Sequence, residues 1–140
     1  MKSILMCIII AAGLLPASAL AAKLEARIDI SEQRMNIYQN GFLRHSWKIS
    51  TARRGYVTPT GNYKPTRMHK MWHSRKYNMS PMPHSIFFKG GYAVHGTNEI
   101  KNLGRPASHG CIRLHPDHAR TLFRMVKQVG RANAAIKIRR

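Results

Sequence analysis

The chain is poor in acidic residues, and this shortage sets its electrostatic character. Only 5 Asp and Glu residues stand against 24 Lys and Arg in 140 residues, which gives a formal net charge of +19 at pH 7. This balance excludes a neutral surface, and a field of this sign attracts polyanions. The alternative is that the charge mainly keeps a small domain soluble.

Cysteine is also scarce, and one of the 2 cysteines lies in a segment that we expect to be removed. Cys7 belongs to an N-terminal segment with the pattern of a secretory signal. This segment has a basic residue near its start, an apolar run over residues 4–15 and small residues up to Ala22. We expect cleavage after Ala21, so that residues 1–21 are a signal peptide and residues 22–140 form one domain. The apolar run is too short to favour a membrane-spanning helix, and no integral span is expected after cleavage.

Export narrows the partners that the positive charge suits. Nucleic acid would be the first expectation for a cytosolic protein of this charge, but an exported protein meets the cell wall, its anionic polymers and the membrane surface instead. We therefore expect no nucleic-acid partner. A single remaining thiol, Cys111, also excludes an internal disulfide in an oxidising compartment. Cys111 is then inert, paired with another molecule, or chemically employed.

Hydrophobic alternation predicts a mainly β domain with one helix after the cysteine loop. Residues 24–30 alternate apolar and polar at the period of a strand, and residues 35–37 continue this pattern to Asn40-Gly41, a dipeptide suited to a type I′ hairpin turn. Residues 42–50 then pair back. Short strands are expected at residues 85–88 and 92–95 around Gly90-Gly91, a helix from Pro116 to the stop at Gly130, and a last strand at residues 134–138.

The middle of the chain is less regular. Residues 58–61 have turn composition, and a strand is expected to begin at residues 63–66. Residues 67–84 mix methionine, aromatic and basic side chains without a clean period, which indicates either a lid or binding loop or an ordinary surface loop. If this segment folds over the site, His69, His73 and His84 line it.

The stretch Ser108-His109-Gly110-Cys111-Ile112-Arg113-Leu114, preceded by His95-Gly96-Thr97-Asn98, carries the chemistry. A thiol whose pKa is lowered by an imidazolium or by backbone amides is a good nucleophile, so Cys111 is the expected nucleophile. His95 and His109 both compete for the role of base. Gly110 lets the chain turn so that the amides of Gly110 and Cys111 face a developing oxyanion.

Four further residues are expected at the substrate. Arg113 either holds a substrate carboxylate or pairs with the loop backbone, and Ser108 either bonds within the turn or contacts substrate. Tyr92 and Thr97 complete the predicted substrate-binding set.

This combination of motifs, together with Thr58-Pro59-Thr60-Gly61, resembles the L,D-transpeptidase (YkuD-type) catalytic domain over the whole expected mature chain. The twelve residues between His95 and Ser108 are similar to the spacing in the branch found in Gram-negative periplasms. The resemblance implies a YkuD-like β-sandwich or mixed β domain that needs no cofactor and no metal. It also implies that His95 is the base, that the Gly96 carbonyl orients it, and that His109 shapes the cysteine loop.

The activity that the resemblance implies is acyl exchange on peptidoglycan stem peptides in the periplasm, in association with the cell wall. Cys111 attacks the carbonyl between a diamino acid and the terminal D-Ala of a tetrapeptide and forms a thioester. A stem amine then gives a 3→3 cross-link, an amine of an outer-membrane protein or lipoprotein gives an anchored protein, and water makes the enzyme an L,D-carboxypeptidase.

Two other classes compete with this interpretation. His109, Cys111, His115 and His118 supply zinc-type donors within ten positions, although their spacing matches no standard zinc pattern. The second alternative is a non-catalytic cell-wall-binding module in which the basic charge acts alone.

Overall fold

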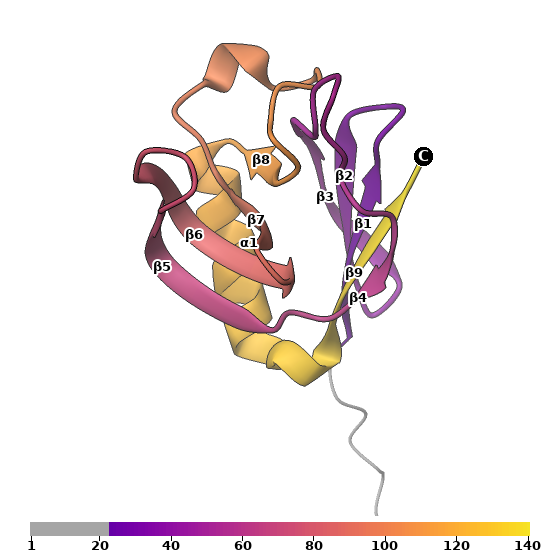
Figure 1. The fold of residues 1–140 in the computed structure, drawn as a ribbon. Coiled ribbons are helices and arrows are strands. Elements are labelled where there is room, and N and C mark those ends of the chain that lie inside the picture. The colour runs from indigo at the N-terminus through magenta and orange to yellow at the C-terminus, as the bar shows by residue number, and fades with distance from the viewer. Residues whose placement is uncertain (1–22) are drawn as a thin grey trace, which may run out of the picture.

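The computed structural model describes residues 23–140, so the expected signal peptide, residues 1–21, lies outside the described residues. The described chain forms two β-sheets and one α-helix (Figure 1). The five-stranded sheet has the order β3-β2-β1-β9-β4 and the four-stranded sheet the order β5-β6-β7-β8. The strands are β1 (Leu24–Asp29), β2 (Arg34–Gln39), β3 (Phe42–Lys48), β4 (Gly61–Tyr63), β5 (Arg67–Ser74), β6 (Ser80–Lys89), β7 (Tyr92–Gly96), β8 (Ile112–Leu114) and β9 (Ala134–Arg139). This confirms the prediction of a mainly β domain with one helix.

The first three strands form the antiparallel meander that the sequence predicts. Leu24, Ala26 and Ile28 of β1 are buried and their neighbours are partly exposed, as the alternation requires. Asn40 and Gly41 have φ angles of 51° and 83°, the positive values that a two-residue type I′ turn needs. On its other edge β1 pairs in parallel with β9, so the first and last strands of the described residues are neighbours in one sheet.

The expectation of an irregular segment at residues 67–84 is wrong, because these residues form most of an antiparallel hairpin. Strand β5 pairs with β6 from Arg67 opposite Phe87 to Ser74 opposite Ser80. Strand β7 pairs with β6 only over residues 86–89, so residues 80–84 have a neighbour on one side alone. Proline is tolerated in such an edge position, which explains how Pro81 and Pro83 fit within a strand.

Two smaller differences from the sequence prediction concern short strands. The expectation of a strand at residues 63–66 is wrong, because β4 ends at Tyr63, residues 64–66 are irregular and β5 begins only at Arg67. Proline at position 65 lacks the amide that would continue the ladder. Strand β8, directly after the cysteine, was not predicted, because three residues are too few to establish a period.

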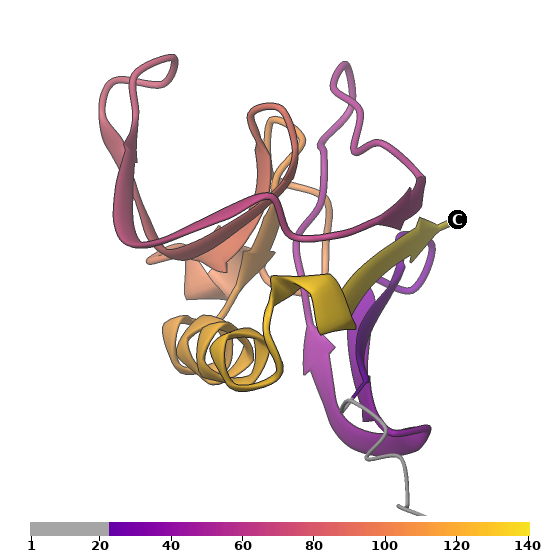
Figure 2. The same cartoon turned by 90° about the horizontal axis from the view of Figure 1, so that it is seen from below.

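Helix α1 (Pro116–Val129) has the predicted limits, and its ends are explained by local chemistry. His115 Nδ1 accepts the Asp117 amide hydrogen at 3.1 Å as a cap, Pro116 occupies the first turn, and Gly130 ends the helix with a φ of 87°. The helix lies along one face of the four-stranded sheet, as Figure 2 shows end-on. No helix within residues 23–140 is long and apolar enough to cross a membrane.

The main core lies between the helix and the inner faces of both sheets. It joins residues such as Ile28, Val94, Ile112 and Leu122 into one apolar cluster. A second, small cluster of Met82, Phe87 and Ala93 forms on the opposite face of the four-stranded sheet, and Trp72 and Cys111 pack against it. The cysteine therefore lies on the face of the sheet that points away from the main core.

Candidate active site

The pairing of β7 with β8 brings the histidine and the cysteine to one face of the sheet. The two strands are parallel, with Val94 opposite Ile112 and His95 opposite Arg113. Val94 and Ile112 are 1% and 0% exposed in the main core. Because side chains alternate along a strand, the residues beside them face the other way, and His95, Cys111 and Arg113 share a side. The sequence separation of 16 residues is thus closed by sheet register.

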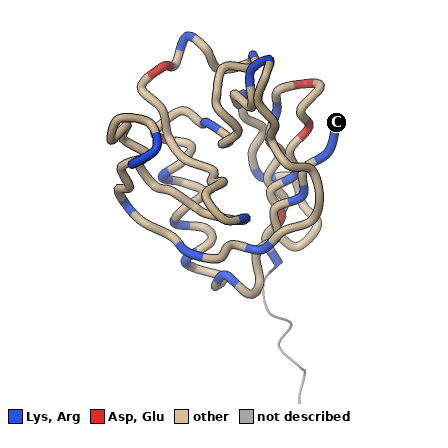
Figure 3. The backbone as a smooth tube through the Cα atoms, viewed as in Figure 1, with Lys and Arg blue, Asp and Glu red and all other residues tan. Residues whose placement is uncertain are grey.

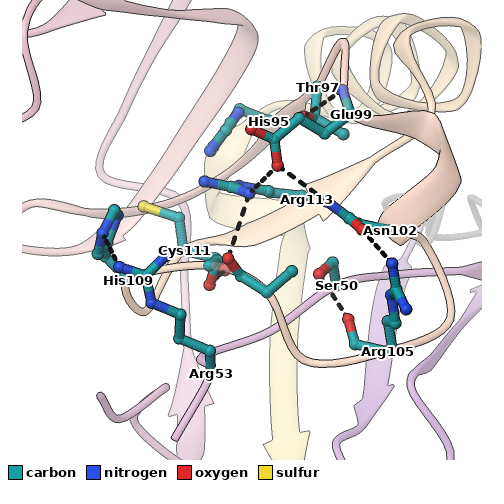
Figure 4. Close-up of polar contacts among 12 residues, drawn as sticks. Ser50, Arg53, His95, Thr97, Glu99, Asn102, Arg105, His109, Cys111 and Arg113 are labelled. Atoms are coloured by element: carbon teal, nitrogen blue, oxygen red, sulfur yellow. Dashed lines mark hydrogen bonds and ion pairs between the residues drawn. The ribbon is translucent and has the colours of Figure 1, made fainter. Parts of the chain in front are cut away.

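These side chains line a cavity of about 580 Å³. Its walls also include residues of the β5–β6 hairpin, among them Trp72, Tyr77 and Met82. The predicted site residues that line the cavity are Tyr92, His95, Thr97, Ser108, His109, Cys111 and Arg113. The other two predicted residues, Gly96 and Gly110, are not part of the lining but act on it through the backbone, as described below. Figure 4 shows His95, Cys111 and Arg113 as one group.

His95 has a fixed tautomer. Its Nδ1 lies 2.7 Å from the carbonyl oxygen of Gly96, and because a carbonyl can only accept, Nδ1 carries the proton. The ring is 6% exposed, and this burial lowers the pKa of His95 from 6.5 to about 4. At neutral pH the imidazole is therefore uncharged, with an unprotonated Nε2 that can accept a proton.

The Cys111 thiol differs from expectation in its acidity. Burial raises the pKa of Cys111 above 9.0, and the Ala93 amide and the Arg113 charge oppose this rise only in part. Its sulfur lies 3.8 Å from the Gly91 carbonyl oxygen and packs against the small apolar cluster. The expectation of a lowered pKa is therefore wrong for this resting structure, because His95 is neutral and supplies no imidazolium.

Ser108 and Gly110 build the turn that presents the cysteine. Ser108 Oγ accepts the Gly110 amide hydrogen at 3.0 Å and donates to the Cys111 carbonyl at 2.6 Å, which matches the first of its two expected roles. Gly110 has a φ of +133°, and a Cβ there would lie 2.6 Å from Cε1 of Tyr92. Its amide already has an acceptor, so the predicted oxyanion hole depends first on the Cys111 amide.

His109 lies on the cavity wall, and three side chains hold it there. Its Nε2 lies 2.8 Å from Nη2 of Arg53, and since a guanidinium only donates, this nitrogen accepts. The ring of Tyr77 stacks on His109 at 4.1 Å and Tyr56 meets it edge-on at 4.8 Å. The lone pair that a general base would use is therefore bonded to Arg53, whereas His95 Nε2 has no such partner within residues 23–140.

Arg113 is paired within the protein, in line with the second of its two expected roles. Its Nη1 donates to Glu99 Oε2 at 3.0 Å and to the Ala107 carbonyl at 3.4 Å (Figure 4). The side chain is 18% exposed and remains part of the cavity wall. The guanidinium thus stands beside the cysteine with a carboxylate on one side and the cavity on the other.

Three contributors to the site were missed in the sequence. Thr58 is buried, accepts the Ala52 amide hydrogen at 3.0 Å and donates to the Gly110 carbonyl at 2.9 Å, so it braces the cysteine loop. Its signal was present in the Thr-Pro-Thr-Gly stretch, which composition identified only as a turn. Arg53 and Glu99 carried no local signal, because their partners His109 and Arg113 lie 56 and 14 residues further along the chain.

Apart from His109, the other histidines considered in the sequence analysis do not join His95 and Cys111 at the cavity. His69, His73 and His84 do not line the cavity, and His84 lines a separate groove beside α1. Of the four zinc-type donors, His115 caps the helix and His118 stacks on Trp47 at 4.9 Å. Within residues 23–140, no three His, Cys, Asp or Glu side chains are grouped to hold a metal ion.

The domain has two mixed sheets and, after the cysteine loop, one α-helix. Its Cys111 thiol shares a cavity with a histidine that a backbone carbonyl orients. Comparison with protein families agrees with that description. Residues 25–133 match the YkuD family, described as the L,D-transpeptidase catalytic domain. The chain belongs to the YkuD L,D-transpeptidase family.

Solved structures share the fold at low sequence identity. An L,D-transpeptidase from Mycobacterium smegmatis is 21% identical with a TM-score of 0.74, and the match covers 85% of this chain and 59% of that one. An L,D-transpeptidase from Mycobacterium tuberculosis is 18% identical with a TM-score of 0.75, and the match covers 85% of this chain and 58% of that one. An L,D-transpeptidase from Xylanimonas cellulosilytica is 23% identical with a TM-score of 0.72, and the match covers 91% of this chain and 66% of that one. The chain thus spans about three fifths of the first two structures, and a comparison with curated proteins gave no match.

Proposed function

We propose that this protein is a thiol acyltransferase in which Cys111 is the nucleophile and His95 the general base. The observation that carries the proposal is the bond from His95 Nδ1–H to the Gly96 carbonyl, which leaves Nε2 free of its proton in the cavity that Cys111 lines. His109 would shape the wall, since its Nε2 is already bonded to Arg53.

The reaction begins from a neutral pair. His95 Nε2 takes the Cys111 proton as the sulfur attacks a substrate carbonyl carbon, because neither a thiolate nor an imidazolium is stable there at rest. The Cys111 amide supports the oxyanion of the tetrahedral intermediate. When the C–N bond breaks, His95 returns the proton to the leaving amine and a thioester to Cys111 remains.

The proposed donor is a peptidoglycan tetrapeptide, cleaved between its diamino acid and the terminal D-Ala. The charge of the cavity supports an anionic donor of this kind. Arg67, Arg75, Lys76 and Arg113 line it, and Glu99 is the one acidic residue in its wall. A stem peptide carries several carboxylates, and a volume of about 580 Å³ is in the range of ordinary ligand sites.

The test is mass spectrometry of the purified protein with a disaccharide tetrapeptide. Wild type should release D-Ala, gain the mass of the acyl tripeptide on Cys111, and pass it to an added stem amine. Cys111→Ala should do none of these, and full turnover by that variant would refute the proposal. Products formed only with water would instead identify an L,D-carboxypeptidase.

We also propose that the protein is exported to the periplasm and held at the cell wall by its charge. A second groove beside α1 is lined by Lys70, Arg120, Arg124 and Lys127 together with His84. Arg120 has a partner in Asp117, whereas Lys70, Arg124 and Lys127 form no ion pair within residues 23–140. Figure 3 shows how few acidic positions accompany the basic ones.

This basic groove is also the observation that favours the non-catalytic alternative, a wall-binding module. Binding to purified sacculi should weaken with salt in both cases, since surface charge is screened over about 8–10 Å at ordinary ionic strength. Binding that persists in Cys111→Ala, in a protein whose wild type forms no acyl-enzyme, would select the binding module.

A further inference from the structure

The strongest unexplained group at the site is Glu99, the one acidic residue in the wall of the cavity. It lies three residues after the end of β7, and its amide donates to Thr97 Oγ1 at 3.1 Å. Its Oε2 accepts two hydrogen bonds, from Asn102 Nδ2 at 3.2 Å and from Arg113 Nη1 at 3.0 Å. Within residues 23–140, Oε1 has no hydrogen-bond partner in the structure, and the side chain is 57% exposed.

These bonds fix the Glu99 carboxylate through Oε2 and leave Oε1 able to accept a hydrogen bond. The two donors hold Oε2 (Figure 4), Oε1 has no hydrogen-bond partner among residues 23–140, and Glu99 is one of the residues that line the cavity. An ion pair that served only to hold Arg113 would need neither the bond from Asn102 nor the open position in a cavity wall. A fixed, partly exposed carboxylate in the same cavity wall as the proposed nucleophile is suited to a cationic ligand.

We propose that Glu99 Oε1 binds the ammonium group of the acyl acceptor and so forms the acceptor subsite of the cavity. This inference rests on the proposed acyl transfer and adds the residue that would hold the acceptor amine, which arrives protonated. The four basic residues of the wall suit the anionic donor but repel a cation, and Glu99 is the residue of the wall whose charge attracts one. The subsite therefore favours an amine over water as the second substrate.

In the second half-reaction the acyl group passes from Cys111 to the bound amine. The ammonium bound at Glu99 gives one proton to that carboxylate, which later returns it to solvent, and the resulting amine attacks the thioester carbon. The new C–N bond forms and the C–S bond breaks. His95 Nε2 accepts the second proton of the nitrogen and passes it to the departing sulfur, so Cys111 regains its thiol and His95 its neutral form.

The experiment compares two acceptors on the same thioester in wild type and in Glu99→Gln. A stem tripeptide offers the side-chain ammonium of its diamino acid, whereas hydroxylamine is largely uncharged at neutral pH. Loss of one charge-assisted bond should lower transfer to the tripeptide relative to hydroxylamine by about tenfold to a hundredfold. Because it is a ratio, any change in the amount of thioester formed cancels.

The matched control is Glu32→Gln, which removes the same charge from an exposed turn outside the cavity and should leave the ratio at the wild-type value. An equal fall with both acceptors in Glu99→Gln would overturn the inference and make Glu99 a positioning residue for Arg113. An unchanged ratio would overturn it as well. If wild type forms no thioester at all, the proposed acyl transfer fails first, and the two failures are distinct.

Discussion

Thr58 Oγ1 donates a hydrogen bond of 2.9 Å to the carbonyl of Gly110, 52 residues further along the chain. The same oxygen accepts the Ala52 amide hydrogen, so one buried hydroxyl ties the segment before β4 to the cysteine loop. The position of the thiol therefore depends on a residue that does not touch the cavity.

Thr58→Val should destabilise the protein and slow acylation of Cys111. The change leaves a buried amide and a buried carbonyl without partners, which costs about 1–3 kcal/mol of the free energy of unfolding. Urea unfolding and acylation rates measure the two effects. Thr60→Val, at an exposed position of the same turn, is the matched control and should change neither.

Gly110→Ala should impair the cysteine loop more severely. The added Cβ would lie 2.6 Å from Tyr92 Cε1 and 2.9 Å from the Val57 carbonyl, at a φ of +133° that other residues rarely adopt. We expect a loss of about 1–3 kcal/mol in stability together with slower alkylation of Cys111. Gly91→Ala, where a Cβ meets nothing within 4 Å, should keep wild-type stability. Equal stability of the two variants would contradict the assigned strain.

The two histidines of the motif should differ in their contribution to acylation. His95→Gln removes the free Nε2 and should lower the rate by about 10²–10⁴-fold, the range of general base catalysis. His109→Gln removes a ring bonded to Arg53 and stacked on Tyr77, and should cost far less. Single-turnover release of D-Ala measures both. A larger loss in His109→Gln would exchange the proposed roles.

Burial of His95 predicts how stability depends on pH. The unfolded chain takes up a proton near pH 6.5, whereas folded His95 stays neutral until about pH 4. The unfolded state thus binds more protons between these values, so the free energy of unfolding falls as pH drops through this window. The shift corresponds to about 3 kcal/mol. Urea midpoints at neutral and acidic pH should show a smaller loss in His95→Gln and an unchanged loss in His73→Gln, an exposed control.

The raised pKa of Cys111 predicts slow alkylation at neutral pH. Burial keeps the thiol protonated, so the thiolate absorbance and the iodoacetamide rate of Cys111 should rise only above the pKa of 9.0 of an ordinary cysteine. A Cys7→Ser background leaves Cys111 as the one thiol to titrate. A plateau already reached at neutral pH would indicate a resting thiolate–imidazolium pair and contradict the neutral starting state.

Local patterns were enough to predict the elements whose burial is one-sided. The alternation in β1, the Asn40-Gly41 turn and the helix that ends at Gly130 depend on neighbours in sequence, and each was found. The β5–β6 hairpin was not predicted, because its residues do not alternate regularly between apolar and polar. Strand β5 lies at the sheet edge, and β6 carries prolines and a His84 with a φ of 51°.

The candidate site divides in the same way. The motif is enough to predict which side chains lie together, since seven of the nine predicted site residues line one cavity and only Gly96 and Gly110 do not. Acidity could not be predicted, because the Cys111 pKa depends on packing against Met82 and Phe87 and the His95 pKa on burial. Long-range contacts also decide the state of Arg113, whose partner Glu99 lies across a loop.

The parallel register of β7 and β8 has a consequence for how this architecture tolerates changes of length. Residues 97–107 connect the two strands outside the sheet, so an insertion there lengthens a connection and leaves the imidazole and the sulfur opposed. A single residue added between Cys111 and Ile112 would instead move the cysteine by one position relative to β8 and turn its sulfur toward the side that Val94 and Ile112 face, the main core. The number of residues between the cysteine and β8 thus decides whether the sulfur faces the cavity or the main core.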